Sequence, residues 1–138
     1  MKKYLSFWLF IFTLSIHAQS FEWIQTPPIT LNSSPSLIGY TTTCDPFGNI
    51  YVTGFQNNAY SYTDIFGDLF YNKYDASGQL IFSKTFTGKV QVYDIKSDSS
   101  GNIYLAVAYV QTMTIGNTTI STSNEGVKPE LLKFDSNG

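Results

Sequence analysis

The chain has 138 residues, of which 43% are hydrophobic, 17% aromatic and only 13% charged. This apolar content is sufficient for a packed core and excludes an intrinsically disordered chain. Ten carboxylates against eight lysines and no arginine give a formal charge of −2, which argues against phosphate or nucleic-acid recognition. A single cysteine excludes an intramolecular disulfide.

The first segment has the pattern of a secretory signal peptide. Lys2 and Lys3 precede an uncharged, mostly apolar run over residues 4–16, and residues 17–20 are mostly small or polar. The apolar run is shorter than the roughly 20 residues that span a bilayer. We expect residues 1–19 to be cleaved, which predicts a secreted, periplasmic or cell-surface protein with no stable membrane span. An uncleaved membrane anchor is the alternative.

Cleavage at this point removes His17, the only histidine, and leaves six lysines and ten carboxylates, a formal charge of −4. Without histidine, Ser-His-Asp and Cys-His sites and His-ligated zinc are excluded. We therefore expect no enzymatic activity and no cofactor. Cys44 is expected to be a small buried residue beside a turn, with a reactive or intermolecular thiol as the alternative.

Two short motifs occur twice. Residues 48–52 (Gly-Asn-Ile-Tyr-Val) return 53 positions later as Gly-Asn-Ile-Tyr-Leu, and residues 73–78 (Lys-Tyr-Asp-Ala-Ser-Gly) return 60 positions later as Lys-Phe-Asp-Ser-Asn-Gly. The unequal offsets predict an insertion within residues 111–126 of the second copy. A period of this length indicates propeller blades, solenoid turns or arrays. We assign residues 20–78 to the first repeat and residues 79–138 to the second.

Each motif lies at a four-residue turn with the pattern Asp-x-x-Gly. Asp at the first position of a type I turn accepts backbone N–H bonds, and Gly at the fourth adopts positive φ without strain. Such turns join antiparallel hairpins, here 69–75 with 79–86 and 90–98 with 102–110. Calcium is the other ligand that Asp would suit, but with one Asp per turn we expect no metal site. The turn residues are Asp45, Gly48, Asp75, Gly78, Asp98, Gly101, Asp135 and Gly138.

Residues 103–110 (Ile-Tyr-Leu-Ala-Val-Ala-Tyr-Val) are apolar throughout, whereas a half-buried strand would alternate. Because the predicted hairpins are antiparallel and no helical period follows residue 20, other sheets must cover both faces of this strand. Stacked small antiparallel sheets are typical of a β-propeller. The predicted fold class is all-β, with antiparallel four-stranded blades of a partial propeller of about two blades.

Residues 45–54 (Asp-Pro-Phe-Gly-Asn-Ile-Tyr-Val-Thr-Gly) resemble the core motif of the bacterial secreted β-propeller repeat, the SBBP-type family. Ala106 departs from the Thr or Gly usual at its position in the second copy. The resemblance covers most of residues 21–138 and implies about two exported repeats of bacterial type, with no activity or catalytic residue to transfer. Residues 98–107 resemble the same core motif, residues 73–78 and 133–138 resemble the second half of the repeat, and residues 114–120 resemble the hairpin between the halves.

The phase of the repeats predicts a role for the segment after the leader. Phe21–Thr26 (Phe-Glu-Trp-Ile-Gln-Thr) is similar to residues 80–85 (Leu-Ile-Phe-Ser-Lys-Thr), the strand expected after a turn. We expect it to be a closing strand of another blade. Because propellers typically need four to eight blades, the predicted partners are further blades of the same array or identical chains, and a fragment of a longer array is favoured.

These observations predict a non-catalytic exported scaffold, structural or protein-interacting. The alternative function is a glycan-binding propeller assembled from several short chains, because Tyr and Trp rings stack on sugars as well as anchoring protein interfaces. The candidate ligand-binding residues, for a protein or glycan, lie in one polar aromatic segment: Asn57, Asn58, Tyr60 and Tyr62. Aromatic packing between blades is the competing interpretation of the tyrosines.

Overall fold

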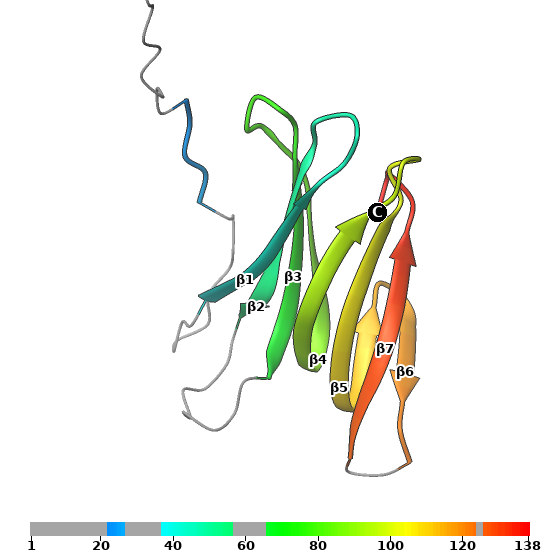
Figure 1. Ribbon diagram of the computed structural model, residues 1–138. Coiled ribbons are helices and arrows are strands. Elements are labelled where there is room, and N and C mark those ends of the chain that lie inside the picture. The colour runs from blue at the N-terminus through cyan, green and yellow to red at the C-terminus, as the bar shows by residue number, and fades with distance from the viewer. Residues whose placement is uncertain (1–21, 27–36, 57–65, 124–125) are drawn as a thin grey trace, which may run out of the picture.

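The computed structural model describes residues 22–26, 37–56, 66–123 and 126–138. Over these ranges the fold is all-β, with no helix and with antiparallel pairing throughout, so the predicted fold class is confirmed at this level. The sheet runs in the order β1-β2-β3-β4-β5-β6, with β7 paired to β5, and it is not closed (Figure 1). The strands are β1 (Leu37–Cys44), β2 (Ile50–Gln56), β3 (Gly67–Tyr74), β4 (Leu80–Ser97), β5 (Ile103–Ile115), β6 (Thr118–Ser121) and β7 (Val127–Phe134).

The long strand β4 divides this sheet into two layers. Its first part pairs mainly with β3, and its second part pairs with β5. We call β1, β2, β3 and residues 80–86 the first unit, and residues 87–97 with β5, β6 and β7 the second unit. Figure 1 shows the two units facing each other, with β1, β2 and β3 on one side and β5, β6 and β7 on the other.

The continuity of β4 corrects the prediction of separate strands over residues 79–86 and 90–98. Gly88 has a φ of 139° at the point where the ladder to β5 shifts register. Its N–H donates to Asp68 Oδ1 at 2.9 Å, and a Cβ on it would lie 2.4 Å from the carbonyl oxygen of Thr112. Glycine therefore lets the strand pass from one unit to the other without a loop.

The core lies between the two units. Tyr71 is at its centre, because its ring contacts the rings of Tyr51, Phe82, Phe86 and Phe134 at centroid distances of 5.3 to 6.3 Å. Full burial of one such side chain contributes about 1.5–3 kcal/mol. The fully enclosed cluster consists of Tyr51, Leu69, Tyr71, Phe86, Val90, Val92, Ile95, Ile103, Leu105, Val107, Tyr109 and Met113.

The two units differ in how their outward faces are covered. In the first unit, Phe70 and Tyr74 on the face away from the core are 1% and 3% exposed. In the second unit, the face of β5 away from the core carries Tyr104, Ala106 and Val110, which are only half-buried. No second layer lies on that side in the part of the chain described, so the prediction that sheets cover both faces of residues 103–110 is met on the core side and stays a prediction on the other.

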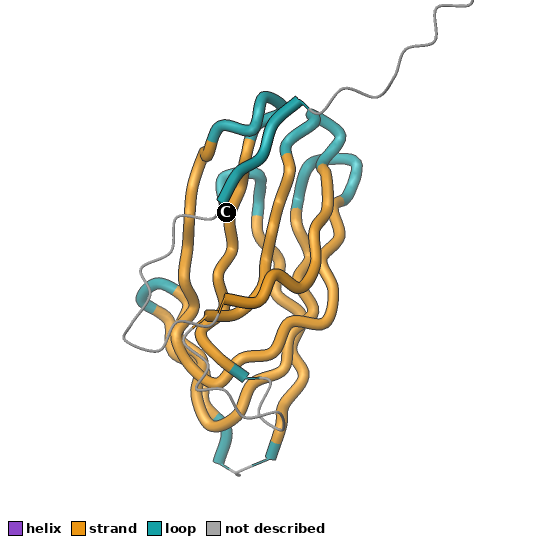
Figure 2. Tube along the Cα trace, turned by 90° about the vertical axis from the view of Figure 1, so that its left-hand side faces the viewer, coloured by secondary structure: helices purple, strands orange, loops and turns teal. Residues whose placement is uncertain are grey.

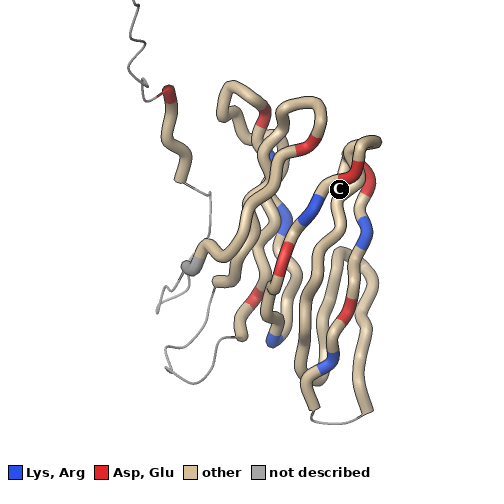
Figure 3. Tube along the Cα trace, in the orientation of Figure 1, with Lys and Arg blue, Asp and Glu red and all other residues tan. Residues whose placement is uncertain are grey.

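The Asp-x-x-Gly turns gather at one end of the molecule, uppermost in Figures 1 and 2. A Cβ built on Gly48 would lie 3.5 Å from the Cβ of Ala76, and one on Gly101 would lie 2.8 Å from the ring of Phe47 and 3.9 Å from the Cβ of Ser136. Four turns from both units thus form one surface. Figure 3 shows carboxylates at this end and charges of both signs along the strands.

Candidate functional site

In the turn at Asp45, the carboxylate accepts hydrogen bonds from four donors. Oδ1 accepts hydrogen bonds from the N–H groups of Phe47 and Asn49, both at 2.9 Å. Oδ2 accepts bonds from the side-chain amide of Asn49 at 2.7 Å and from the Tyr51 hydroxyl at 3.1 Å. Gly48 closes the turn, with a φ of 85° and its N–H bonded to the carbonyl of Asp45 at 3.1 Å.

The turn at Asp98 repeats this arrangement atom for atom. Oδ1 accepts bonds from the N–H groups of Ser100 and Asn102 at 2.9 Å, and Oδ2 accepts bonds from the Asn102 amide at 2.8 Å and the Tyr104 hydroxyl at 3.2 Å. Gly101 has a φ of 79°. The repeated Gly-Asn-Ile-Tyr motif therefore has a physical cause: its Asn and Tyr are donors to the preceding Asp, a role that sequence reasoning missed although the repetition itself was the signal.

The turns at Asp75 and Asp135 are simpler. Asp75 Oδ1 accepts bonds from the N–H and hydroxyl of Ser77 and from the N–H of Gln79. Asp135 Oδ1 accepts a bond from the N–H of Asn137 at 2.8 Å. The closing glycines of these two turns have φ values of 83° and 88°. All four predicted Asp and Gly pairs thus lie in turns of the same backbone shape.

These hydrogen bonds hold the carboxylates in the charged form. Burial by itself raises the pKa of Asp45, but the bonds from Asn49, Phe47 and Tyr51 outweigh it and leave the pKa below its ordinary value. The side chain of Asn102 is the largest cause of the lowered pKa of Asp98. Because their lone pairs are engaged by donors of the turn, these groups are poorly suited to proton transfer. Among the described residues no three potential ligands cluster into a metal site.

Three polar contacts join the two units at the turn end. Lys73, which is 7% exposed, places its ammonium group 5.3 Å from the ring centroid of Tyr51 and donates to the carbonyl oxygen of Ser136 at 2.7 Å. The Ser97 hydroxyl donates to the carbonyl oxygen of Cys44 at 2.6 Å, and Lys84 donates to the carbonyl of Gly138. These contacts fix the turns of one unit against the other.

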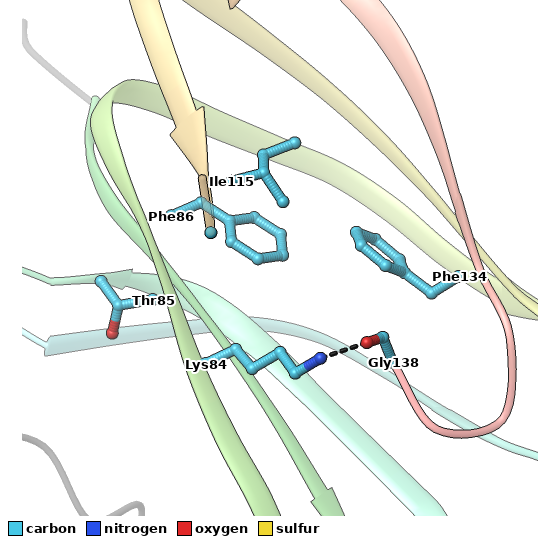
Figure 4. Close-up of a pocket in the computed structure, with 7 residues that line it drawn as sticks. Lys84, Thr85, Phe86, Ile115, Phe134 and Gly138 are labelled. Carbon is cyan, nitrogen blue, oxygen red and sulfur yellow. Dashed lines mark hydrogen bonds between the residues drawn. The ribbon is translucent and has the colours of Figure 1, made fainter. Parts of the chain in front are cut away.

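A cavity of about 410 Å³ lies between the units beside the last turn (Figure 4). Phe86 and Phe134 form its floor, with ring centroids 5.6 Å apart. Lys84 supplies its one charged side chain, whose ammonium is already bonded to the Gly138 carbonyl. Thr85, Ile115 and Gly116 complete the lining. The described residues that line the cavity thus offer mainly apolar contact, since the Thr85 hydroxyl points away from the two rings and accepts a bond from the Gln56 amide.

The predicted ligand-binding residues Asn57, Asn58, Tyr60 and Tyr62 lie outside the described residues. Cys44 is the last residue of β1 and is exposed, so the prediction that it is buried is wrong. The physical reason is its position at the end of an edge strand, since β1 pairs with β2 alone in the ranges that the structure describes. The predicted signal peptide, residues 1–19, also lies outside the described ranges.

The segment predicted to be a closing strand is described from Glu22 to Thr26 and forms no strand there. Its Trp23 packs on a turn, because a Cβ on Gly78 would lie 2.7 Å from the indole ring. A Cβ on Gly138 would likewise lie 2.8 Å from the ring of Phe82. Trp23 therefore has the same relation to the first unit as Phe82 has to the second, as the similarity of the two segments predicts.

No protein-family model, curated protein or solved structure matches this chain. The described residues include no helix that is both long and apolar enough to cross a membrane.

Proposed function

We propose that the chain is a pair of β-propeller blades that serves as a non-catalytic structural or protein-interaction scaffold of an exported protein. The observation that carries the proposal is the repeated geometry of the two units. The carboxylates of Asp45 and Asp98 receive the same four kinds of donor, at distances that agree within 0.1 Å. Repetition at this level is typical of arrays of stacked supersecondary units.

Two further features repeat outside the turns. The first strand of each unit has a β-bulge at the equivalent place, between Gly39 and Thr41 in β1 and between Val92 and Asp94 in β4. These bulges give the two units the same strand geometry, and bulges are typically retained within families as structural features.

The same cation–π pair also occurs in both units. The ammonium of Lys73 lies 5.3 Å from the ring centroid of Tyr51, and that of Lys133 lies 5.3 Å from the ring centroid of Tyr104. The residues that recur in the repeats are thus engaged in turns, bulges and packing. This pattern favours a scaffold over an enzyme, because an active site would need at least some polar residues that do not recur in the repeat.

Glycan arrays and hydrogen exchange test this proposal on the exported chain. A scaffold of two interdependent blades binds no glycan above background, and Tyr71→Ala in β3 removes amide protection from β5 and β7 as well. A glycan ligand that is lost in Tyr60→Ala with Tyr62→Ala, and retained in a Tyr40→Ala control, would replace the scaffold by the glycan-binding alternative. Independent loss of protection in the two units would contradict the proposal.

A further inference from the structure

We infer that the uncovered face and free edge of the second unit bind a second copy of this chain head to tail, with residues 22–26 of that copy added to β7. This inference rests on the proposed function, because it treats the two units as equivalent blades.

The uncovered face belongs to the second unit and carries apolar side chains. Leu131 is 68% exposed and Tyr93 is 52% exposed, and Tyr104 and Ala106 beside them are half-buried. Among the described residues β7 is also a sheet edge, since it pairs there with β5 only, whereas its equivalent β3 pairs on both sides. An uncovered apolar face next to an open strand edge is a surface that natural sheets normally cover.

The molecule itself shows what such a face packs against. The repeat places Tyr51 and Tyr71 of the first unit at the positions of Tyr104 and Leu131 in the second. Tyr51 and Tyr71 are both 0% exposed, because the second unit lies on them. The natural cover for Tyr104 and Leu131 is therefore the outward side of another first unit.

The lysines give this contact a specific polar partner. Lys73 lies over Tyr51 and also donates to the carbonyl of Ser136 in the last turn of the facing unit. Lys133 has the same position over Tyr104. The carbonyl equivalent to that of Ser136 belongs to Ala76, which is exposed in the turn of the first unit. A second copy would bring its Ala76 carbonyl to the Lys133 ammonium.

Residues 22–26 supply the missing strand. Figures 1 and 2 place this segment on the side of the first unit away from the second unit, with Trp23 on Gly78. Phe82, which packs the same way on Gly138, lies in the strand that pairs with β3. Residues 22–26 therefore lie where the outer strand of a neighbouring blade would pack against the first unit of their own chain. The second unit of that chain lies on the opposite side of the first unit.

The register of this added strand follows from the first unit. Lys73 pairs with Phe82 and Tyr71 with Lys84. By the repeat, Lys133 of one copy pairs with Trp23 of the other, and Leu131 pairs with Gln25. Since side chains alternate between faces along a strand, Ile24 of the added segment points away from Leu131.

Light scattering on the full chain after export, with its processed N-terminus determined by mass spectrometry, measures the association. Because propellers have typically four to eight blades, we expect one closed species of about two to four copies. Leu131→Asp should weaken the association at least about tenfold without unfolding the chain, because it places a charge in the docking face. Tyr40→Asp is the control, because Tyr40 is 50% exposed and contacts Phe55 on the side of the first unit that faces the second unit, away from the docking face.

Disulfide trapping tests the register in a Cys44→Ser background. Gln25→Cys combined with Leu131→Cys should cross-link different copies under mild oxidation, and Ile24→Cys combined with Leu131→Cys should not. A monomer, a polydisperse aggregate, or a cross-link confined to one chain would overturn the inference. A cooperatively folded monomer that binds no glycan would overturn this inference and leave the scaffold proposal standing. Glycan binding that is lost in the Tyr60 and Tyr62 variant would contradict the scaffold proposal, whatever the oligomeric state.

Discussion

Lys73 in β3 donates a 2.7 Å hydrogen bond to the carbonyl oxygen of Ser136, although 63 residues separate them in the sequence. The lysine is 7% exposed and its ammonium also faces the ring of Tyr51. One side chain therefore connects the core of the first unit to the last turn of the second. This link gives the two units a shared polar contact in addition to their apolar packing.

Lys73→Met keeps the aliphatic stem but removes the ammonium. We expect it to lower the free energy of unfolding by about 2 kcal/mol, from the lost charged hydrogen bond and cation–π contact. Urea denaturation measures the change. Lys96→Met is the control, because the ion pair that Lys96 forms with Asp94 is exposed and screened by solvent, so its loss should have a much smaller effect. Equal effects of the two substitutions would contradict the assigned role of Lys73.

Asp45→Ala removes a carboxylate that accepts four hydrogen bonds and belongs to a residue that is 5% exposed. The expected loss is about 2–4 kcal/mol of unfolding free energy. Asp98→Ala should cost less, because that turn is more exposed. Asp94→Ala should have the smallest effect of the three, because Asp94 lies in an exposed ion pair. Chemical denaturation of the three variants gives the order, and a smaller effect at Asp45 than at Asp94 would refute this account of the turns.

Acid should destabilise the fold. The pKa values of Asp45, Asp75 and Asp98 are lowered in the folded chain, so each carboxylate contributes stability that is present above its unfolded pKa of about 3.9. That stability is lost as the pH falls through the lower folded values. Melting temperatures measured from pH 7 to pH 2 should decline below about pH 4, and Asp45→Asn should make the decline shallower. If the melting temperature of Asp45→Asn depended on pH in the same way as that of the wild type, Asp45 would be excluded as a contributor to the acid destabilisation.

Asn72 is 0% exposed, and neither its amide nitrogen nor its oxygen has a hydrogen-bond partner. Burial of an unpaired amide costs about 1–3 kcal/mol, and Leu132 occupies the equivalent position of the second repeat. Asn72→Leu should therefore raise the melting temperature. Asn72→Asp, which buries a charge of nearly the same shape, should lower it strongly. Scanning calorimetry of both variants decides, and a destabilised leucine variant would indicate that the amide has a partner in solution.

Gly101→Ala is expected to be costly for two reasons. The φ of 79° disfavours any side chain, and the new Cβ would lie 2.8 Å from the ring of Phe47. Together these should remove about 1–3 kcal/mol of unfolding free energy. Adding Phe47→Ala should recover the steric part only. Gly39→Ala is the control, since nothing lies within 4 Å of its Cβ position. Full recovery in the double variant would show that backbone strain contributes nothing.

The hairpin turns and the antiparallel β class were predictable because their causes are local. Asp45 finds all its donors within six residues, and the Asp98 turn does the same. A short segment therefore carries enough information to specify such a turn, whatever the rest of the chain does. The similarity of residues 21–26 to the start of β4 predicted a closing strand, and the structure instead shows no strand there but equivalent packing of Trp23 and Phe82 on glycines.

What covers each strand depended on contacts between distant residues. The apolar run from Ile103 to Val110 is compatible with burial on one face or on both, and only the packing of the units left Tyr104 and Val110 half-buried. The unbroken course of β4 through Gly88 and the exposure of Cys44 were decided in the same way, by which elements lie beside them. The alternation of apolar residues and the chemistry of turns act over a few residues, whereas burial depends on surfaces that meet only after the chain has folded. For this reason the candidate docking face could be recognised only from the tertiary structure.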